Sequence, residues 1–293
     1  MKYSVIIPHK NTPRLLQRML DSIPQRDDLE VIVVDDNSDP GIVDFSQYPG
    51  HDRPGTRLIF TKKGRGAGYA RNVGMDNAQG EWLIFADADD WFVTENMKHL
   101  LDYNLPPDCD VLVWDMLQTP FDAPPAICDP TVTIHTDTSL IYRKYISPWY
   151  KMVRHRFLSS NKIRFDETRF SNDVTYSVKI ALSASKYYFY SSVVYVNDTQ
   201  PTGLMNTITY RGTCQRINIE LKAKRLLKKH NLYWYSSNWY DAMYRISILS
   251  FFYFLFKEVI LLGFNHTKHD YIMACKYAGI STNPLRNIFR KMR

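Results

Sequence analysis

The first ninety residues alternate short apolar runs with stretches of helical periodicity, and this alternation restricts the fold more than any other feature of the sequence. Continuous apolar runs are typical of strands that are buried on both faces, and the intervening helices supply the two covering layers. The strand-like runs are residues 4–7, 30–34, 58–60 and 82–86, and the helical stretches are 15–23 and 67–78. We therefore predict an α/β fold in which a mostly parallel central sheet is flanked by helices.

Polar residues follow three of the predicted strands, at the point where each strand ends. These segments are Pro8-His9-Lys10-Asn11, Asp35-Asp36-Asn37-Ser38 and Asp87-Ala88-Asp89-Asp90. The carboxyl ends of parallel strands lie at one edge of a sheet, where α/β proteins bind their ligands. We expect the three segments to converge there and to form a site.

The later part of the chain departs from this regular alternation. We predict two more strands at residues 111–114 and 193–196, and helical pieces over residues 145–184. Further helical patterns cover residues 214–230 and 242–262. We place a catalytic domain at residues 1–212 and a helical C-terminal appendage at residues 213–293.

The C-terminal appendage combines positive charge with apolar surface. Residues 221–293 contain 13 Lys and Arg but only 3 Asp and Glu. The longest uncharged stretch there, residues 246–256, would span about 16 Å as a helix, against roughly 30 Å of bilayer hydrocarbon. It cannot cross a membrane alone, so its wide apolar face must meet either protein, as in a homo-oligomer, or an anionic membrane surface.

Composition and cysteine usage exclude several other classes. The chain has 45% apolar and 23% charged residues, as ordinary globular proteins do. Its four cysteines are scattered and include no Cys-x-x-Cys pair, which argues against a zinc site and a disulfide framework. The apolar run near Met1 is too short for a signal peptide. We expect a cytoplasmic protein that binds no nucleic acid, since no nucleic-acid-binding module is recognisable.

The acidic run Asp87-Ala88-Asp89-Asp90 is an Asp-x-Asp motif that suits a divalent cation. Adjacent carboxylates repel one another unless a cation is near, and Mn²⁺ or Mg²⁺ takes carboxylate and phosphate oxygens together. A solvated acidic turn or a helix N-terminus is the alternative for such a motif on its own. The wider pattern of the sequence favours the metal site.

A glycine-rich approach to a helix, residues 64–74, carries a second candidate group. It lacks the third glycine of the dinucleotide-binding fingerprint at the required spacing. Arg71 within it could instead steady the acidic strand end or a diphosphate. A carboxylate of the segment Asp35-Asp36-Asn37-Ser38 could accept hydrogen bonds from a base or ribose, although such a segment on its own is as often an Asx-rich turn.

Four segments, in order, spacing and strand context, resemble the bacterial family 2 glycosyltransferases of GT-A fold. They are Val5-Ile6-Ile7-Pro8, Val33-Val34-Asp35-Asp36-Asn37-Ser38, Gly68-Tyr69-Ala70-Arg71-Asn72-Val73-Gly74 and Gly80 to Trp91. The resemblance covers about residues 1–100 and implies a Rossmann-like GT-A domain. It also implies that Asp36 holds the nucleobase and that Pro8 and His9 line its pocket.

The same resemblance implies that Asp87 contacts the ribose or the sugar and that Asp89 ligates Mn²⁺ or Mg²⁺. A weaker resemblance continues through Trp149, which we place among the substrate-binding residues, to Asn172-Asp173. The family has a Glu-Asp pair at this last place, and its Asp is the general base. Here Asn172 replaces the Glu, and Asp173 is the base candidate. A helix N-terminal carboxylate is the alternative for Asp173.

The resemblance thus implies an inverting, metal-dependent glycosyltransferase. It would move a hexose or N-acetylhexosamine from a nucleoside-diphosphate sugar, with UDP favoured, to a hydroxyl of a bacterial surface glycan or lipid-linked oligosaccharide. The enzyme would work in the cytoplasm, with peripheral attachment to the inner face of the cell membrane as a further expectation. Two alternatives remain: a nucleotidyltransferase, and a sugar-nucleotide-binding protein with weak or no turnover.

Overall fold

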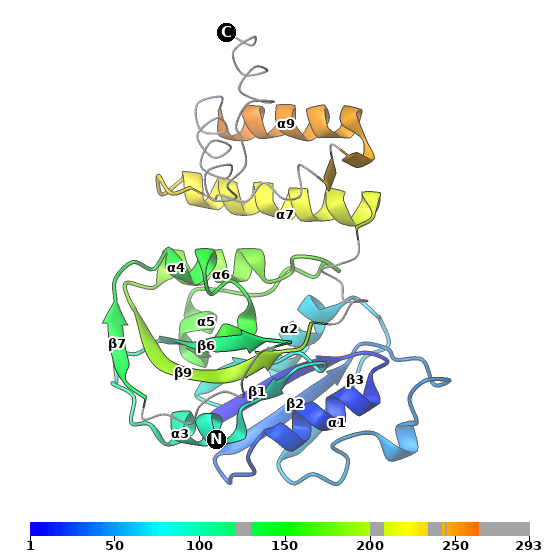
Figure 1. Ribbon diagram of the computed structural model, residues 1–293, viewed down its shortest axis with the longest axis vertical. Helices are drawn as coiled ribbons and strands as arrows, with labels where there is room; N and C mark the ends of the chain where they lie inside the picture. The colour runs from blue at the N-terminus through cyan, green and yellow to red at the C-terminus, as the bar shows by residue number, and fades with distance from the viewer. Residues whose placement is uncertain (121–129, 200–207, 234–241, 244, 264–293) are drawn as a thin grey trace. The chain divides into compact units, whose positions relative to one another are not determined.

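The structure is a computed structural model that describes residues 1–120, 130–199, 208–233, 242–243 and 245–263 (Figure 1). The chain divides into two compact units, Met1–Gly203 and Leu204–Arg293. The boundary that we expect from the sequence, at residue 212, lies inside the second unit.

Four neighbouring parallel strands form the first part of the sheet in the N-terminal unit. They are β1 (Tyr3–His9), β2 (Leu29–Asp35), β3 (Thr56–Phe60) and β4 (Trp82–Phe85). Their order is β3-β2-β1-β4, and every adjacent pair is parallel. All residues of β1, β2 and β4 are buried, as their continuous apolar runs require. The predicted parallel sheet is therefore confirmed.

Helices cover both faces of this sheet. Val5 and Ile7 of β1 share one core cluster with Leu16 of helix α1 (Pro13–Ser22). Ile6 points to the other face, where a Cβ added to Gly74 of α2 (Ala67–Asn77) would lie only 2.4 Å from its Cγ2. Helices α1 and α2 therefore pack on opposite faces, and α3 (Thr94–Asp102) joins the cluster on the α1 face.

The sheet continues beyond β4 with strands of mixed direction. These are β5 (Trp91–Phe92), β6 (Val111–Gln118), β7 (Val132–His135), β8 (Lys151–Arg154) and β9 (Tyr187–Asn197). The order runs on as β4-β8-β6-β9-β5, and β7 pairs with β9. Shorter helical elements complete the unit: η1 (Phe45–Gln47), α4 (Leu140–Arg143), η2 (Pro148–Tyr150), α5 (His155–Ser160) and α6 (Val174–Ser183).

Strand β8 corrects our prediction that residues 145–184 form only helical pieces. It runs antiparallel between β4 and β6, and all four of its side chains are buried. Two of the four are basic, so the strand lacks the apolar run by which a buried strand is recognised. Main-chain carbonyls accept hydrogen bonds from both: Lys151 Nζ donates to Ser147 O at 2.7 Å, and Arg154 Nε donates to Cys109 O at 2.6 Å. Arg154 also forms an ion pair with Glu81.

The C-terminal unit contains two long helices, α7 (Tyr210–Lys228) and α9 (Ile248–Leu262). One apolar cluster joins Ile217 and Leu221 of α7 with Phe251 and Phe254 of α9. A buried ion pair accompanies it, in which Lys224 Nζ lies 2.9 Å from Glu258 Oε1. No helix in the described residues is both long and apolar enough to cross a bilayer.

Gly80 lies just before β4 and packs tightly against the main chain of β1, so its substitution tests how close this packing must be. A Cβ at Gly80 would lie 2.5 Å from the main-chain nitrogen of Ser4, which cannot move without distorting β1. We expect Gly80→Ala to lower the free energy of unfolding by about 1–3 kcal/mol, measured by urea denaturation. Gly41→Ala is the matched control because a Cβ there meets only the side chain of Asp39, and it should change stability by less than about 0.5 kcal/mol. Equal stability of the two variants would contradict this account.

Candidate active site

The three polar segments do converge, as expected, at the carboxyl ends of neighbouring strands. His9 ends β1 opposite Asp35, which ends β2, and β4 lies on the other side of β1. Pro8 fits inside this central strand because the ladder between β1 and β4 ends at Ile6, before the residue that has no N–H. The edge of the sheet therefore presents the ends of β2, β1 and β4 in that order.

A buried hydrogen-bond network joins the ends of β1 and β2. Asp35 accepts hydrogen bonds from the Ser38 hydroxyl at 2.5 Å and from Tyr48 at 2.9 Å, and its carboxylate lies 3.1 Å from His9 Nδ1. Burial alone would raise the pKa of Asp35, but the hydrogen bonds from His9 and Ser38 lower it to about 2. The main-chain N–H of Thr12 donates to His9 Nε2, so the His9 side chain, which has no exposed surface, acts within this network.

Asp36 holds the glycine-rich segment that precedes α2. Its two carboxylate oxygens accept the main-chain N–H groups of Arg65 at 2.9 Å and Gly66 at 2.7 Å. Gly66 has φ +93°, a conformation that glycine adopts without strain. The buried carboxylate thus fixes the shape of the loop beside the strand ends.

Arg71 links two candidate regions that lie far apart in the sequence. Its guanidinium pairs with Asp87, and Nη1 donates to Asn172 Oδ1 at 2.7 Å. The side chain is buried and lies over the ring of Phe165. Gly68 permits this approach, since a Cβ there would lie 2.0 Å from the carbonyl oxygen of Asp166. Arg71 therefore brings the acidic strand end beside the segment that carries Asp173.

The three aspartates of the acidic run have different surroundings. Asp90 is buried and points inward, where it accepts hydrogen bonds from Tyr195, Asn197 and the main chain of Asp198. Asp87 is partly exposed, and its main-chain N–H donates to the Tyr195 hydroxyl at 2.9 Å. Asp90 thus has a structural role, whereas Asp87 and Asp89 are the two aspartates of the run that could bind a ligand.

Asp89 is a desolvated carboxylate beside other carboxylates. Desolvation, followed by repulsion from Asp87 and Asp198, raises its pKa to about 6. Arg18 acts in the opposite direction, but it donates its hydrogen bonds to the main-chain carbonyl of Asp89 and to the carboxylate of Asp198. Within the described residues, no set of three or more His, Cys, Asp or Glu side chains could hold a metal ion by itself. The surroundings of Asp89 therefore suit a cation that takes most of its ligands from a bound molecule.

Asp173 lies at the N-terminal end of α6, and its side chain does not cap that helix. This position is also the one that the alternative, a helix N-terminal carboxylate, requires. Burial raises the pKa of Asp173, while the charges of Arg71 and Lys151 act in the opposite direction. Burial lowers the pKa of Lys151 to about 7. A carboxylate in this setting can accept a proton from a neighbouring hydroxyl.

Trp149 is 8% exposed and belongs to the core, so only a small part of its surface can meet a substrate. Its ring stacks on Tyr195 with a centroid distance of 5.3 Å and an interplanar angle of 5°. Tyr195 in turn bonds Asp90 and Asp87. Trp149 thus holds the ring of Tyr195 in place, and the Tyr195 hydroxyl contacts the acidic run.

Sequence reasoning missed several residues that shape the site: Arg18, Lys151, Tyr195 and Asp198. One signal could have found Asp198, because Asn197-Asp198 follows a predicted strand, as the other polar segments do. Of the remaining three, Arg18 lies in helix α1, Lys151 in strand β8, which the sequence did not reveal, and Tyr195 in the middle of β9. Their role depends on which strands are neighbours, which no local pattern states.

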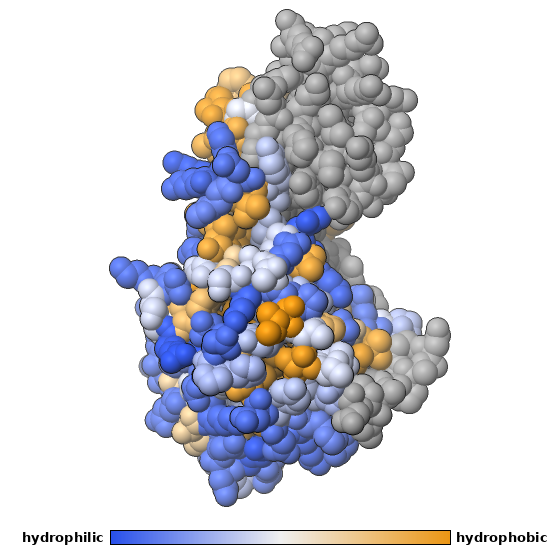
Figure 2. All heavy atoms as spheres, turned by 90° about the vertical axis from the view of Figure 1, so that its left-hand side faces the viewer, coloured by the Kyte–Doolittle hydropathy of each residue, from blue (hydrophilic) through white to orange (hydrophobic). Residues whose placement is uncertain are grey.

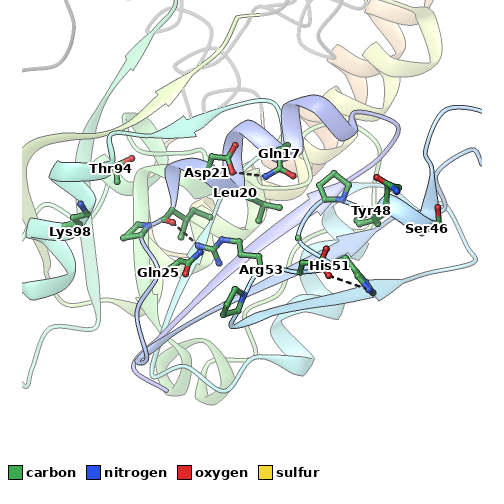
Figure 3. A pocket seen from close by; sticks show the side chains of 17 residues that line it. Gln17, Leu20, Asp21, Gln25, Ser46, Tyr48, His51, Arg53, Thr94 and Lys98 are labelled. Atoms are coloured by element: carbon green, nitrogen blue, oxygen red, sulfur yellow. Dashed lines mark hydrogen bonds and ion pairs between the residues drawn. The ribbon is translucent and has the colours of Figure 1, made fainter.

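A separate cavity of about 780 Å³ lies between α1, the loop around residues 46–54 and α3 (Figure 3). Gln17, Asp21, His51, Arg53 and Lys98 give it a polar lining. None of the eight predicted site residues lines this cavity. We therefore assign the site to the strand ends and not to the cavity.

Comparison with known proteins finds relatives among glycosyltransferases. Residues 4–117 match the sequence model of Glycosyl transferase family 2. Poly(ribitol-phosphate) beta-N-acetylglucosaminyltransferase TarS of Staphylococcus aureus is 29% identical over 213 residues, which is 69% of this chain and 36% of TarS. The chain therefore spans about a third of the length of TarS. The cholesterol galactosyltransferase of Borreliella burgdorferi is 25% identical over 286 residues, which is 90% of this chain and 77% of that protein.

The fold has solved counterparts. The crystal structure of S. aureus TarS 1-349 in complex with UDP-GlcNAc aligns with a TM-score of 0.61 at 20% identity, covering 99% of this chain and 86% of that one. This likeness confirms the GT-A fold expected from the sequence. The family match over residues 4–117, which include the strands that carry the acidic run, and the curated relatives support the resemblance to the bacterial family 2 glycosyltransferases.

Proposed function

We propose that this protein is an inverting glycosyltransferase. It moves a hexose or N-acetylhexosamine from a nucleoside-diphosphate sugar, with UDP as the favoured nucleotide, to a hydroxyl of a surface-glycan acceptor. One observation carries the proposal: Arg71 contacts both Asp87 and Asn172, so the acidic run and Asp173 share one edge of the sheet.

The donor nucleotide would bind over the ends of β1 and β2. Asp36 and Pro8 lie there, and the His9 side chain keeps Asp35 in position. Asp36 already accepts two main-chain hydrogen bonds, so a nucleobase would use the remaining lone pairs of its carboxylate. Asp87 would meet the ribose or the sugar, with Arg71 beside it as a positive charge toward the diphosphate.

Asp89 would hold the divalent cation, Mn²⁺ or Mg²⁺. Desolvation and the nearby carboxylates Asp87 and Asp198 raise its pKa, so a bound cation would stabilise its ionised form. When bound, the cation offsets the negative charge that develops on the leaving diphosphate. One or two protein carboxylates are enough for this role, since phosphate oxygens complete the coordination.

Asp173 would act as the general base. It takes the proton of the acceptor hydroxyl while the acceptor oxygen bonds to the anomeric carbon, and the bond between that carbon and the diphosphate oxygen breaks on the opposite face. The diphosphate leaves with the bonding electron pair, so the anomeric configuration inverts. Trp149 would contribute its exposed edge to the wall of the acceptor site.

The names of the relatives suggest two acceptor classes. TarS acts on poly(ribitol phosphate), which supports a surface glycan, and the Borreliella relative acts on cholesterol, which supports a hydroxyl carried by a lipid. Both classes agree with an oligosaccharide linked to a membrane lipid and with a reaction at the inner face of the cell membrane. A nucleotidyltransferase would release pyrophosphate instead, and a binding protein would release nothing.

Asp173→Asn tests the base. We expect kcat to fall by about 10²–10⁴-fold because the acceptor proton loses its carboxylate, while UDP affinity stays within about twofold. UDP release and isothermal titration measure the two quantities. Glu167→Gln is the control, because Glu167 pairs with exposed Arg65 and its loss should leave kcat unchanged. An Asp173→Asn enzyme with the parent's kcat would remove Asp173 from this role.

The pH dependence of the reaction follows from the same residue. Burial raises the pKa of Asp173 above 3.8, and only the ionised carboxylate can accept a proton. The rate should therefore rise with pH through a pKa above 3.8, and Asp173→Asn should abolish that limb of the kcat/KM profile. Survival of the limb in the variant would assign it to another group.

Asp89→Asn tests the cation site without any turnover. The pKa of Asp89 in the folded protein, about 6, exceeds 3.8, so ionisation of Asp89 destabilises the ligand-free protein as the pH rises between these values. At pH 7.5 the variant should be more stable by about 1–2 kcal/mol in urea denaturation, with no gain below pH 4. It should also lose most of the thermal stabilisation that UDP with Mn²⁺ gives the parent. Equal stabilisation of parent and variant would contradict the site.

Asp90→Ala is the contrasting variant. Burial and repulsion from Asp87 and Asp89 raise the pKa of Asp90 as well, but its loss leaves three donors without their acceptor, and we expect the variant to lose roughly 2–4 kcal/mol of stability. Opposite signs for the two neighbouring aspartates would distinguish a ligand-binding carboxylate from a structural one.

The donor is identified by a panel of nucleotide sugars with Mn²⁺ or Mg²⁺, read first by thermal shift and then by release of the nucleoside diphosphate. We expect a UDP-sugar to give the largest shift and the fastest release. A larger shift and faster release with a GDP-sugar would overturn the choice of uracil, and release of pyrophosphate would favour the nucleotidyltransferase.

A further inference from the structure

Helix α9 buries one face and exposes another, and both faces are apolar. The buried face carries Phe251, Phe254, Leu255 and Leu262, with Glu258 among them. The exposed face carries five large apolar side chains that are 43% to 81% exposed: Leu249, Phe252, Tyr253, Phe256 and Ile260. At 100° per residue these five fall within an arc of roughly 100°, opposite the buried set. We call them the α9 stripe.

The only charges of α9 lie off the stripe. Glu258 is on the buried face, paired with Lys224. Lys257 lies on the flank, where its ammonium donates to Asn218 of α7 at 2.7 Å. The stripe itself is therefore a continuous apolar strip along the helix, of the kind that soluble monomers seldom leave in water.

Helix α7 lies alongside α9 and runs in the same direction. Three hydrogen bonds set this arrangement: Tyr210 with Ser250, Asn218 with Lys257, and Lys224 with Glu258. Asn218, Arg211, Lys222 and Arg225 are exposed and fall on one side of α7. Because Asn218 contacts Lys257, this basic side of α7 adjoins the flank of the α9 stripe.

The exposed charge of this unit has a single sign in the residues that the structure describes. The two carboxylates there, Glu220 and Glu258, are both buried, whereas several Lys and Arg residues are exposed. Figure 2 shows hydrophobic and strongly hydrophilic side chains reaching the surface together in this unit. Apolar and basic surfaces side by side match the acyl chains and anionic headgroups of a lipid leaflet.

The length of α9 settles the mode of contact. Its 15 residues would span about 22 Å, less than the roughly 30 Å of a hydrocarbon core. We propose that α9 lies in the plane of an anionic lipid surface, with its stripe among the acyl chains and the basic side of α7 against the headgroups. A second copy of the chain would also cover the stripe, but it would bring basic surfaces together, which like-charge repulsion opposes.

Co-sedimentation of the full-length protein with lipid vesicles tests the proposal. Vesicles of phosphatidylcholine with about 30% phosphatidylglycerol should bind the parent at least tenfold more strongly than phosphatidylcholine alone, and salt should weaken the binding. Phe252→Ser with Phe256→Ser should reduce binding at least tenfold. Ile134→Ser, an equally exposed apolar residue on β7, is the matched control and should bind as the parent does.

A second variant, Arg211→Gln with Arg225→Gln, should lose about tenfold in binding to the anionic vesicles and much of the salt dependence. Both changes lie on exposed positions, so folding should persist. The proposal fails if the parent does not bind, or if the serine variant binds as the parent does. It also fails if the serine variant dissociates a dimer in sedimentation velocity without lipid, because the stripe is then a subunit interface. UDP release in solution should be unchanged in both variants, which separates this result from the proposed catalysis.

Discussion

The ion pair between Arg71 and Asp87 is the interaction on which the arrangement of the site depends. It joins a helix to a strand end, and the same guanidinium reaches Asn172 through a second nitrogen. A buried guanidinium is stable only when its donors meet acceptors. Arg71 therefore holds Asp87 and Asn172 in fixed positions relative to each other. Arg71 Nε is buried with no hydrogen-bond partner among the described residues, so even this network leaves one donor unmatched.

The acidic run illustrates how stability and ligand binding are divided between neighbours. Asp90 contributes to folding through Tyr195, Asn197 and the main chain of Asp198. Asp89, one residue earlier, is desolvated beside other carboxylates, which disfavours its charge in the free protein. The charge of Asp90 is disfavoured in the same way, but only Asp90 has hydrogen-bond donors from Tyr195, Asn197 and Asp198 around its carboxylate.

Much of the fold and of the site's location could be predicted from the sequence. Continuous apolar runs give β1, β2 and β4, and polar residues after them give the edge on which the candidates gather. Strand β8 could not be predicted, because Lys151 and Arg154 remove its apolar pattern and their compensation by Ser147 and Cys109 carbonyls is visible only in three dimensions. The support of Asp90 by Tyr195 spans 105 residues and depends on strand neighbours.

The replacement of the family's Glu by Asn172 also has a structural reading. Arg71 receives a neutral oxygen there instead of a second hydrogen-bonded carboxylate, so Asp87 is the carboxylate with which it forms an ion pair. The guanidinium thus keeps more of its charge for an anionic ligand, and the repulsion acting on Asp173 is smaller than a Glu at position 172 would cause.

The reversed direction of β8 has a consequence for how such a protein can diversify. Because β8 runs opposite to β4, its first residue, Lys151, lies at the edge where β4 ends, and the segment before β8 borders the site. The parallel strands β1, β2 and β4, in contrast, border the site with the segments that come after them in the chain. Substitutions upstream of β8 can therefore remodel one wall of the site while the loops after β1 and β2 stay unchanged, so the two sides of the site can diverge independently.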